Sequence, residues 1–146
     1  MYLKNIIREG IVMKFYRIER WCYLHHFKIL AKIIYHIMQL IFGCTIPYSA
    51  DIGEGVKIAH FHGIVVHHKS SIGDGSVLYQ NVCLGGRNGK CGPIVGKNCV
   101  VGAGACILGE IVIGDNVNIG ANAVVLEDVP QNCTVVGIPA KIVKRG

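Results

Sequence analysis

Residues 95–125 read VGKNCVVGAGACILGEIVIGDNVNIGANAVV, and this stretch decides the fold. An aliphatic side chain recurs every six residues along it, at Val95, Val101, Ile107, Ile113, Ile119 and Val125. A period of six fits neither an amphipathic strand, which has period two, nor an α-helix, which has period 3.6. It predicts triangular coils of three short strands, with the aliphatic side chains inside and glycine or asparagine at the corners.

The same period continues on both sides of this stretch. Further Ile, Val or Leu residues occupy positions 46, 52, 58, 66, 72, 78 and 84 upstream, and positions 136 and 142 downstream. A small or β-branched residue often stands four positions later, as at Ala105 and Ala123, and we expect it to face inward near a corner. Strands in such coils pair in parallel with the strands of the neighbouring coils. The sequence therefore predicts an all-β parallel solenoid over residues 45–146.

The repeat is interrupted three times. Two extra residues lie between Ile58 and Val66, five between Leu84 and Val95, and five between Val125 and Val136. Insertions leave a solenoid as surface loops, where binding sites are commonly built. The first interruption contains a histidine cluster, and the second, residues 85–93, reads GGRNGKCGP.

Residues 1–44 carry a different pattern, with apolar side chains spaced three or four apart and lysine or arginine between them. This spacing predicts a separate segment of one or two amphipathic helices. Its apolar face is expected to cover the open end of the solenoid. The alternative is a peripheral contact of this basic, Trp21-containing segment with an anionic membrane. The apolar stripe consists of Phe15, Ile18, Cys22, Ile29, Ile33, Ile37 and Ile41.

The amino-acid composition limits the classes of molecule that this chain is expected to bind. The net charge is +6, but the cations are scattered without a basic run, which argues against nucleic acid and is compatible with a polyanionic small molecule such as CoA. Seven cysteines with no Cys-x-x-Cys pair and no secretory signal indicate reduced thiols in a cytoplasmic protein, and no metal is expected. Charged residues make up only 16% of the chain, which favours an oligomer.

Four motifs resemble the hexapeptide-repeat acyltransferases, and within them the serine acetyltransferase-like branch. They are IAHFHGIVV at 58–66, QNVCLGG at 80–86, VGAGA at 101–105 and VGIPAK at 136–141. The resemblance implies a left-handed parallel β-helix, a homotrimer, and acetyl-CoA as acyl donor, bound between neighbouring prisms.

The resemblance also assigns roles to individual residues. It makes His60 the general base, because imidazole can accept a proton from an attacking hydroxyl at neutral pH. His62, four positions after Ile58, is expected to face inward and to orient His60. A backbone N–H at Gly85 or Gly86 is the candidate donor to the developing oxyanion.

Binding of CoA is assigned by the same resemblance. Ala103 and Ala121 stand in the coils along which related proteins pass the pantetheine arm. Lys141, together with Lys144 and Arg145, is a candidate for contacting the phosphates.

Three features depart from the serine acetyltransferase pattern, the first being the helical segment before the β-helix, which is reduced to about 44 residues. Thr45 occupies the position of an acidic residue that steers the base, and the loop 87–93 lacks the Asp-Arg-His-Pro stretch of the serine pocket. These departures make acetylation of a sugar or polysaccharide-precursor hydroxyl the leading expectation. Serine O-acetylation in cysteine biosynthesis is the alternative, and a non-catalytic β-helix scaffold is a third possibility.

Overall fold

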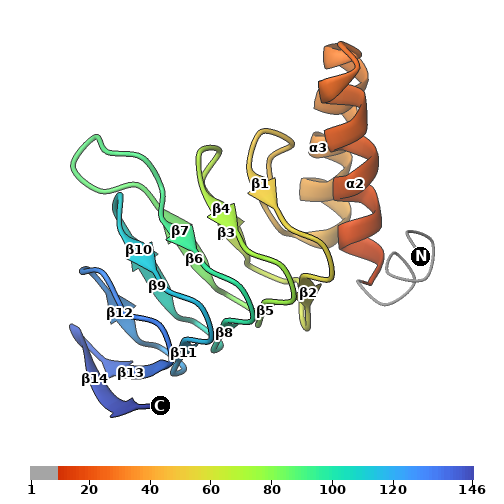
Figure 1. The fold of residues 1–146 in the computed structure, drawn as a ribbon. Coiled ribbons are helices and arrows are strands. Elements are labelled where there is room, and N and C mark those ends of the chain that lie inside the picture. Colours follow the sequence, from red (N-terminus) through yellow and green to blue (C-terminus); the bar gives the residue numbers. More distant parts are fainter. Residues whose placement is uncertain (1–9) are drawn as a thin grey trace.

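The structure is a computed structural model, and it describes residues 10–146 apart from the side chain of Arg145. Two antiparallel helices, α2 (Ile11–Leu24) and α3 (Lys28–Phe42), stand at one end of a prism built from short strands (Figure 1). The strands wind around the prism in chain order, so that each coil adds one strand to each of three sheets. The parallel solenoid predicted from the hexapeptide period is confirmed.

The three sheets form the three faces of the prism. Sheet I contains β1 (Asp51–Ile52), β4 (Ser71–Ile72), β7 (Ile94–Val95) and β10 (Val112–Ile113). Sheet II contains β2 (Lys57–Ile58), β5 (Val77–Leu78), β8 (Val100–Val101), β11 (Asn118–Ile119), β13 (Cys133–Gly137) and β14 (Ala140–Arg145). Sheet III contains β3 (Val65–Val66), β6 (Cys83–Gly85), β9 (Cys106–Leu108) and β12 (Val124–Val125). The paired strands run parallel, except for the antiparallel hairpin of β13 and β14.

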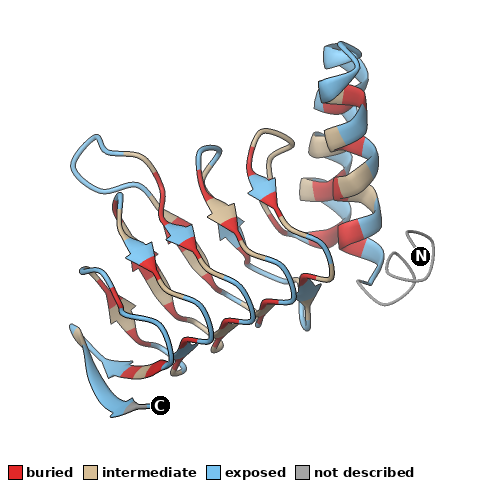
Figure 2. Cartoon of the chain, viewed as in Figure 1, coloured by how far each residue is buried: buried red, intermediate tan, exposed pale blue. Residues whose placement is uncertain are grey.

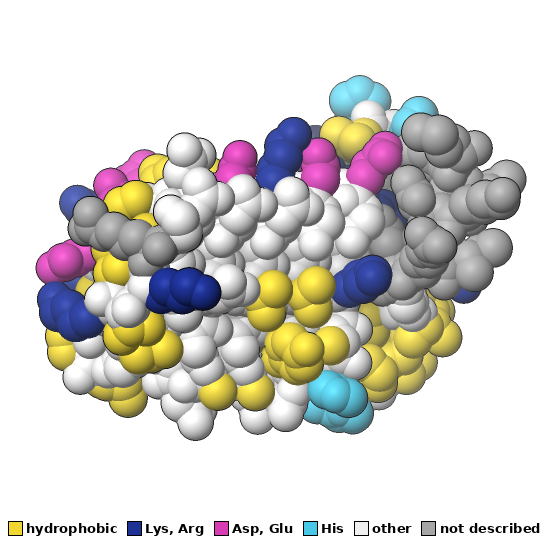
Figure 3. Space-filling view, turned by 60° about the horizontal axis from the view of Figure 1, so that its bottom comes forward, with side chains coloured by type: hydrophobic (Ala, Val, Ile, Leu, Met, Phe, Trp, Pro, Cys, Tyr) yellow, Lys and Arg dark blue, Asp and Glu magenta, His cyan; other side chains and the backbone are white. Residues whose placement is uncertain are grey.

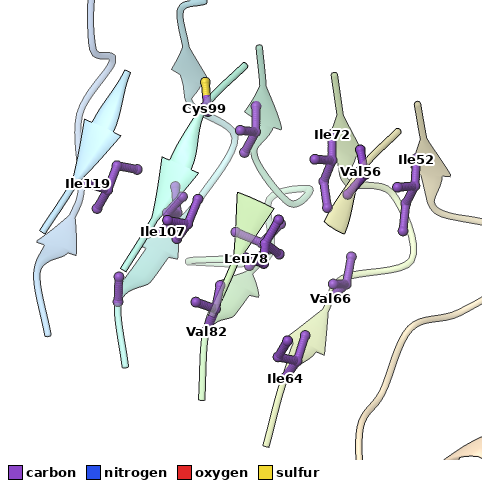
Figure 4. Packing of buried hydrophobic residues seen from close by; sticks show 14 of the residues in the cluster. Ile52, Val56, Ile64, Val66, Ile72, Leu78, Val82, Cys99, Ile107 and Ile119 are labelled. Atoms are coloured by element: carbon purple, nitrogen blue, oxygen red, sulfur yellow. The ribbon is translucent and has the colours of Figure 1, made fainter. Parts of the chain in front are cut away.

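The core is a stack of aliphatic side chains inside the prism (Figure 4). The predicted inward aliphatic positions from Ile46 to Val125 are buried, with Ile58 partly buried. Each strand is only two or three residues long in most coils, so it gains stability by pairing with both neighbours and by stacking its inward side chain. Burial of one such side chain contributes about 1.5–3 kcal/mol.

The first two predicted interruptions are confirmed by the strand register. Ile52 pairs with Ile72, and Ile72 pairs with Val95. The first and second insertions are therefore accommodated outside the strands, and the register of the neighbouring coils is kept. The third predicted interruption is wrong. Ile113 pairs with Val129 rather than with a residue eighteen positions later, and Val135, not Val136, follows Ile119 into the core.

The reason for this error is the end of the solenoid. The last coil is shortened at one corner, and the chain then turns back as the β13–β14 hairpin. Val136 and Ile142 are consequently 39% and 37% exposed, although the sequence period places both inside.

The helices close the first coil of the prism. The Tyr16 hydroxyl donates to the carbonyl oxygen of Ala50 at 2.7 Å and accepts from the backbone N–H of Ile52 at 3.2 Å. Arg17 donates to the carbonyl oxygen of Ile52 at 2.6 Å, and the ring of Phe42 lies 5.4 Å from that of Phe61. In Figure 2 the buried positions of both helices accordingly alternate with long exposed stretches.

The helical faces are not arranged as the sequence predicts. In the expected core-facing stripe, Ile18, Ile29, Ile33, Ile37 and Ile41 are exposed. Because α3 is apolar around most of its circumference, packing rather than periodicity selects the buried face. Within residues 10–146 neither helix is both long and apolar enough to cross a membrane. The face that is buried consists of Val12, Met13, Tyr16, Glu19 and Cys22 on α2, and of Ala31, Met38 and Phe42 on α3.

Candidate active site

His60 is exposed at the corner between β2 and β3, on the edge where sheets II and III meet. The corners of the next three coils lie along this same II–III edge. Backbone hydrogen bonds stack them, from Asn81 N–H to the His62 carbonyl (3.0 Å), from Gly104 N–H to the Gln80 carbonyl (2.9 Å) and from Asn122 N–H to the Ala103 carbonyl (2.8 Å). The edge is therefore a continuous column of turns beginning at His60.

Residues with positive φ make these sharp corners possible. Gly63, Asn81, Gly104 and Asn122 have φ values of 71°, 59°, 71° and 57°, a region that glycine and asparagine tolerate best. A side chain at Gly63 would collide with the Asn81 amide of the next coil. The two extra residues of the first coil enlarge only this corner.

The ring of Tyr79, on the next coil, lies near the ring of His60. Their ring centroids lie 6.4 Å apart at an interplanar angle of 50°, and Tyr79 is 37% exposed. Sequence reasoning missed Tyr79, because it belongs to none of the motifs and only the stacking of coils brings it beside His60. The pair places an imidazole and a phenol at one solvent-accessible surface.

Thr45, which stands where an acidic residue was expected, lies on the first coil. Its backbone pairs with Val65 of sheet III, and its hydroxyl accepts a hydrogen bond from Gln39 Nε2 at 3.4 Å. The Thr45 side chain is thus engaged with helix α3.

The prediction that His62 faces inward is wrong. His62 is exposed, and its ring packs against that of Phe61 at 4.4 Å. Ile64 fills the inward position instead and is fully buried. The cause is the two-residue insertion, which lies before this position and moves the inward residue from 62 to 64.

Gly85 and Gly86 lie at the opposite end of sheet III, on the III–I edge. Here the second insertion leaves the prism as a loop, the longest of the green segments in Figure 1. His67 holds this loop, since its Nδ1 accepts from the backbone N–H groups of Gly92 and Lys69, both at 3.2 Å. Partial burial, with His68 and Lys69 nearby, lowers the pKa of His67. His67 and His68 therefore line the loop rather than the corner of His60.

A small cleft opens at the base of this loop, with a volume of about 120 Å³. Its charged side chains are Arg87, Lys90 and Glu110, so both signs of charge occur in one place. The remaining lining residues are Asn88, Leu108, Gly109, Ile111 and Leu126.

The residues expected to bind CoA fall into two groups. Ala103 is partly buried and Ala121 exposed, both in the column of turns that begins at His60. Lys141 is exposed on β14, where it pairs with Val136. Val136 in turn lies close to Gly120 of the II–III edge, since a Cβ atom added at Gly120 would be only 2.7 Å from the Val136 side chain. Lys144 is exposed on the same strand, and the side chain of Arg145 lies outside the described residues.

One chain thus brings His60, Ala103, Ala121 and Lys141 to one edge and places Gly85 and Gly86 on another. Sheet III separates the two groups. Within residues 10–146 there is no cluster of three or more His, Cys, Asp or Glu side chains that could hold a metal ion.

Comparison with known proteins identifies the class of this fold. A model of the bacterial transferase hexapeptide, described as six repeats, matches residues 92–127. A serine acetyltransferase of Synechococcus elongatus is 42% identical over 133 residues, which are 89% of this chain and 54% of that protein. One of Helicobacter pylori is 41% identical over 133 residues, covering 89% of this chain and 78% of that protein.

Solved structures agree with these relatives. The crystal structure of Neisseria gonorrhoeae serine acetyltransferase in complex with serine superimposes with a TM-score of 0.86 and 37% identity, over 91% of this chain and 55% of that one. A serine acetyltransferase in complex with CoA gives a TM-score of 0.85 and 38% identity, over 90% and 55%. This chain therefore spans about half the length of the Synechococcus relative and of both solved chains.

The fold is thus the left-handed parallel β-helix of the hexapeptide-repeat transferases. Within that class, the chain belongs to the serine acetyltransferase family.

The expectation of a sugar or polysaccharide-precursor acetyltransferase is wrong, because the relatives and structural neighbours are serine acetyltransferases. That expectation rested on the short helical segment and on two local departures, at Thr45 and in the loop 87–93. A few surface side chains can change within a family while the coils that carry them persist. These departures therefore do not exclude the chain from the serine acetyltransferase family.

Proposed function

We propose that this protein transfers the acetyl group of acetyl-CoA to the hydroxyl of L-serine. The observation that carries the proposal is the II–III edge, on which an exposed histidine begins a column of turns leading past Ala103 and Ala121 to Lys141. A related structure holds CoA and another holds serine, which supports this pair of substrates.

His60 acts as the general base in this proposal. Its imidazole removes the proton from the serine hydroxyl while the oxygen attacks the thioester carbonyl of acetyl-CoA. A tetrahedral intermediate forms, and the C–S bond then breaks. The CoA sulfur leaves and takes up the proton from the imidazolium, so the histidine returns to its starting state and the product is an O-acetyl ester. Alignment of the two bound substrates supplies much of the rate enhancement.

The proposed active unit is a homotrimer in which each site is shared by two chains. The outward side chains of sheet III are apolar: Val65, Cys83, Cys106, Leu108, Val124 and Leu126. This uncharged face lies between the II–III edge, with His60, and the III–I edge, with Gly85, Gly86 and the loop. A rotational contact in a closed ring joins two different patches. Such a contact would bring His60 of one chain beside the loop of its neighbour.

The surface of the prism is consistent with this assembly. In Figure 3, several Asp and Glu side chains lie along one margin with a Lys or Arg side chain between them, and hydrophobic side chains gather along the opposite margin, next to a histidine. These acidic side chains belong to the edge between sheets I and II, where Glu54, Asp74 and Asp115 stand. That edge carries none of the proposed site residues.

The acceptor needs partners for both of its charges. Free serine presents an ammonium and a carboxylate, and the cleft at the loop offers Arg87 and Lys90 for the carboxylate and Glu110 for the ammonium. This set supports a zwitterionic acceptor despite the absence of the expected acid and histidine from the loop.

Acetyl transfer is tested by incubating the full chain with acetyl-CoA and L-serine and detecting O-acetylserine by mass spectrometry. Direct detection avoids thiol reagents, which would react with the seven cysteines. We expect O-acetylserine with L-serine and no ester with glucose or a nucleotide sugar. Binding of CoA without any product from L-serine would overturn the serine proposal, and no binding of CoA would favour a scaffold.

The assembly is tested by light scattering of the purified chain at micromolar concentration. We expect a mass close to three times 15.9 kDa. Val65→Glu and Val124→Glu place charges on the outer face of sheet III, and they should yield monomers with little activity. Val112→Glu makes the same change on sheet I and should remain trimeric. A wild-type monomer with full activity would contradict the shared site.

A further inference from the structure

The turn between helices α2 and α3 and the helical ends that flank it form an exposed apolar surface. Residues 21–33, called here the hairpin apex, stand at the end of the prism in Figure 1 and are mostly exposed in Figure 2. Ile29 is 79% exposed, and Trp21 stacks on Phe27 with ring centroids 6.0 Å apart. The exposed large apolar residues of the apex are Trp21, Leu24, Phe27, Ile29, Leu30 and Ile33.

The apolar surface continues beyond the apex along both helices. On α2 it includes Ile11 and Ile18, and on α3 it includes Ile37, Leu40 and Ile41, with Leu40 being 86% exposed. Five members of the stripe that the sequence places against the prism belong to this exposed surface: Ile18, Ile29, Ile33, Ile37 and Ile41. Isolated exposed apolar residues are ordinary, but so many of them on two packed helices mark an interaction surface.

The charge around this surface is mainly positive, and the exposed carboxylate beside α2, that of Asp51, is already paired with Arg20 at 3.0 Å. Exposed Lys14, Lys28 and Lys32 lie beside the apolar side chains. The sole acidic residue in the sequence from 10 to 50 is Glu19, and it is fully buried on the opposite face of α2. A second copy of this face would oppose lysine to lysine with no carboxylate to pair, whereas a surface bearing phosphate groups would be attracted.

We propose that the hairpin apex docks on an anionic lipid bilayer, with the apolar side chains in the interface and the lysines against the phosphate headgroups. Basic residues flanking an apolar helical face, together with an aromatic residue that has a polar N–H, are the features of interfacial helices. The II–III edge lies on the sides of the prism, so docking through the apex leaves His60 open to its substrates.

The fluorescence of Trp21 reports on docking, because Trp21 is the single tryptophan of the chain. The full chain is titrated with phosphatidylcholine vesicles containing 30% phosphatidylglycerol, and with vesicles of phosphatidylcholine alone. We expect a blue shift of Trp21 emission, protection from acrylamide and co-sedimentation with the anionic vesicles. Binding should weaken at 0.5 M salt, because screening shortens the range of the attraction.

Two pairs of variants test the apolar and the charged parts separately. Ile29→Glu with Ile33→Glu should abolish co-sedimentation, and Val112→Glu with Ile138→Glu, on exposed positions of the β-helix, should not. Lys28→Glu with Lys32→Glu should weaken partitioning at least about tenfold. Lys57→Glu with Lys144→Glu makes the same change in net charge elsewhere and should have a clearly smaller effect.

Three outcomes would overturn the proposal. The first is wild-type protein that shows neither a Trp21 shift nor co-sedimentation with anionic vesicles. The second is binding that both apex variants retain. The third is vesicle-independent self-association that Ile29→Glu with Ile33→Glu removes, since it would assign the surface to a second copy. The wild-type titration is informative even where a variant fails to fold, and circular dichroism identifies such a failure.

Discussion

Replacing His60 by alanine is expected to lower kcat for acetyl transfer by two to four orders of magnitude, the usual contribution of a general base. Because His60 is exposed and its ring fills no core position, the variant should fold and unfold like the wild-type protein. Initial rates from mass spectrometry, measured beside thermal unfolding, separate loss of chemistry from loss of structure.

His68→Ala is the matched control for this experiment. His68 is also exposed, but it lies on the III–I edge and packs against His67 at 4.2 Å. We expect a change in kcat of less than about tenfold. Equal losses in both variants would contradict a specific role of His60, and full activity of His60→Ala would assign the base to another residue. His62→Ala tests the role of orienting His60, which stays a prediction.

Glu19→Gln is expected to change how stability depends on pH. Glu19 is fully buried on α2, and neither carboxylate oxygen has a hydrogen-bond partner among the described residues. Burial raises the pKa of this carboxyl from 4.5 to about 9. The titratable groups near it are Tyr35 on α3 and Cys44, whose own pKa values are also raised chiefly by burial. The folded protein therefore holds Glu19 neutral at physiological pH.

The direction of the effect follows from proton binding. Between pH 4.5 and about 9 the unfolded chain has released the Glu19 proton and the folded protein has kept it, so the free energy of unfolding falls as pH rises. The fall attributable to this group reaches at most about 1.4 kcal/mol per pH unit. Glu19→Gln cannot ionise, and it should exceed the wild type in stability at pH 8 while matching it near pH 4.5.

Urea unfolding at fixed protein concentration, at pH 4.5, 6, 7 and 8, measures this difference. Glu127→Gln, at an exposed glutamate, should show a small difference at every pH. A Glu19→Gln advantage that stays constant from pH 4.5 to 8 would contradict a neutral buried carboxyl.

Regular parts of this protein follow from its sequence because each coil repeats one local rule. The inward aliphatic positions from Ile46 to Val125 are correct, and so are the first two insertions, since a strand with one buried face tolerates no slip of register. The rule fails where repetition ends. At Val135 and Val136 the chain turns into a hairpin, and at His62 an insertion shifts the inward residue. At these positions the packing against neighbouring strands, and not the six-residue period, decides which side chain faces the core.

The sequence by itself also located His60 at an exposed corner, because a break in the repeat marks a turn that leaves the coil. Only the tertiary structure decided what surrounds it. Tyr79 lies beside His60 because successive coils stack on one another, although it belongs to none of the motifs. Gly86 is separated from His60 by the whole width of sheet III, although the motifs that contain these two residues follow one another in the sequence. The helices show the same division most clearly. Periodicity predicted an amphipathic α3, but packing against α2 and the first coil chose the face of Ala31, Met38 and Phe42, which left the more regular isoleucine stripe exposed.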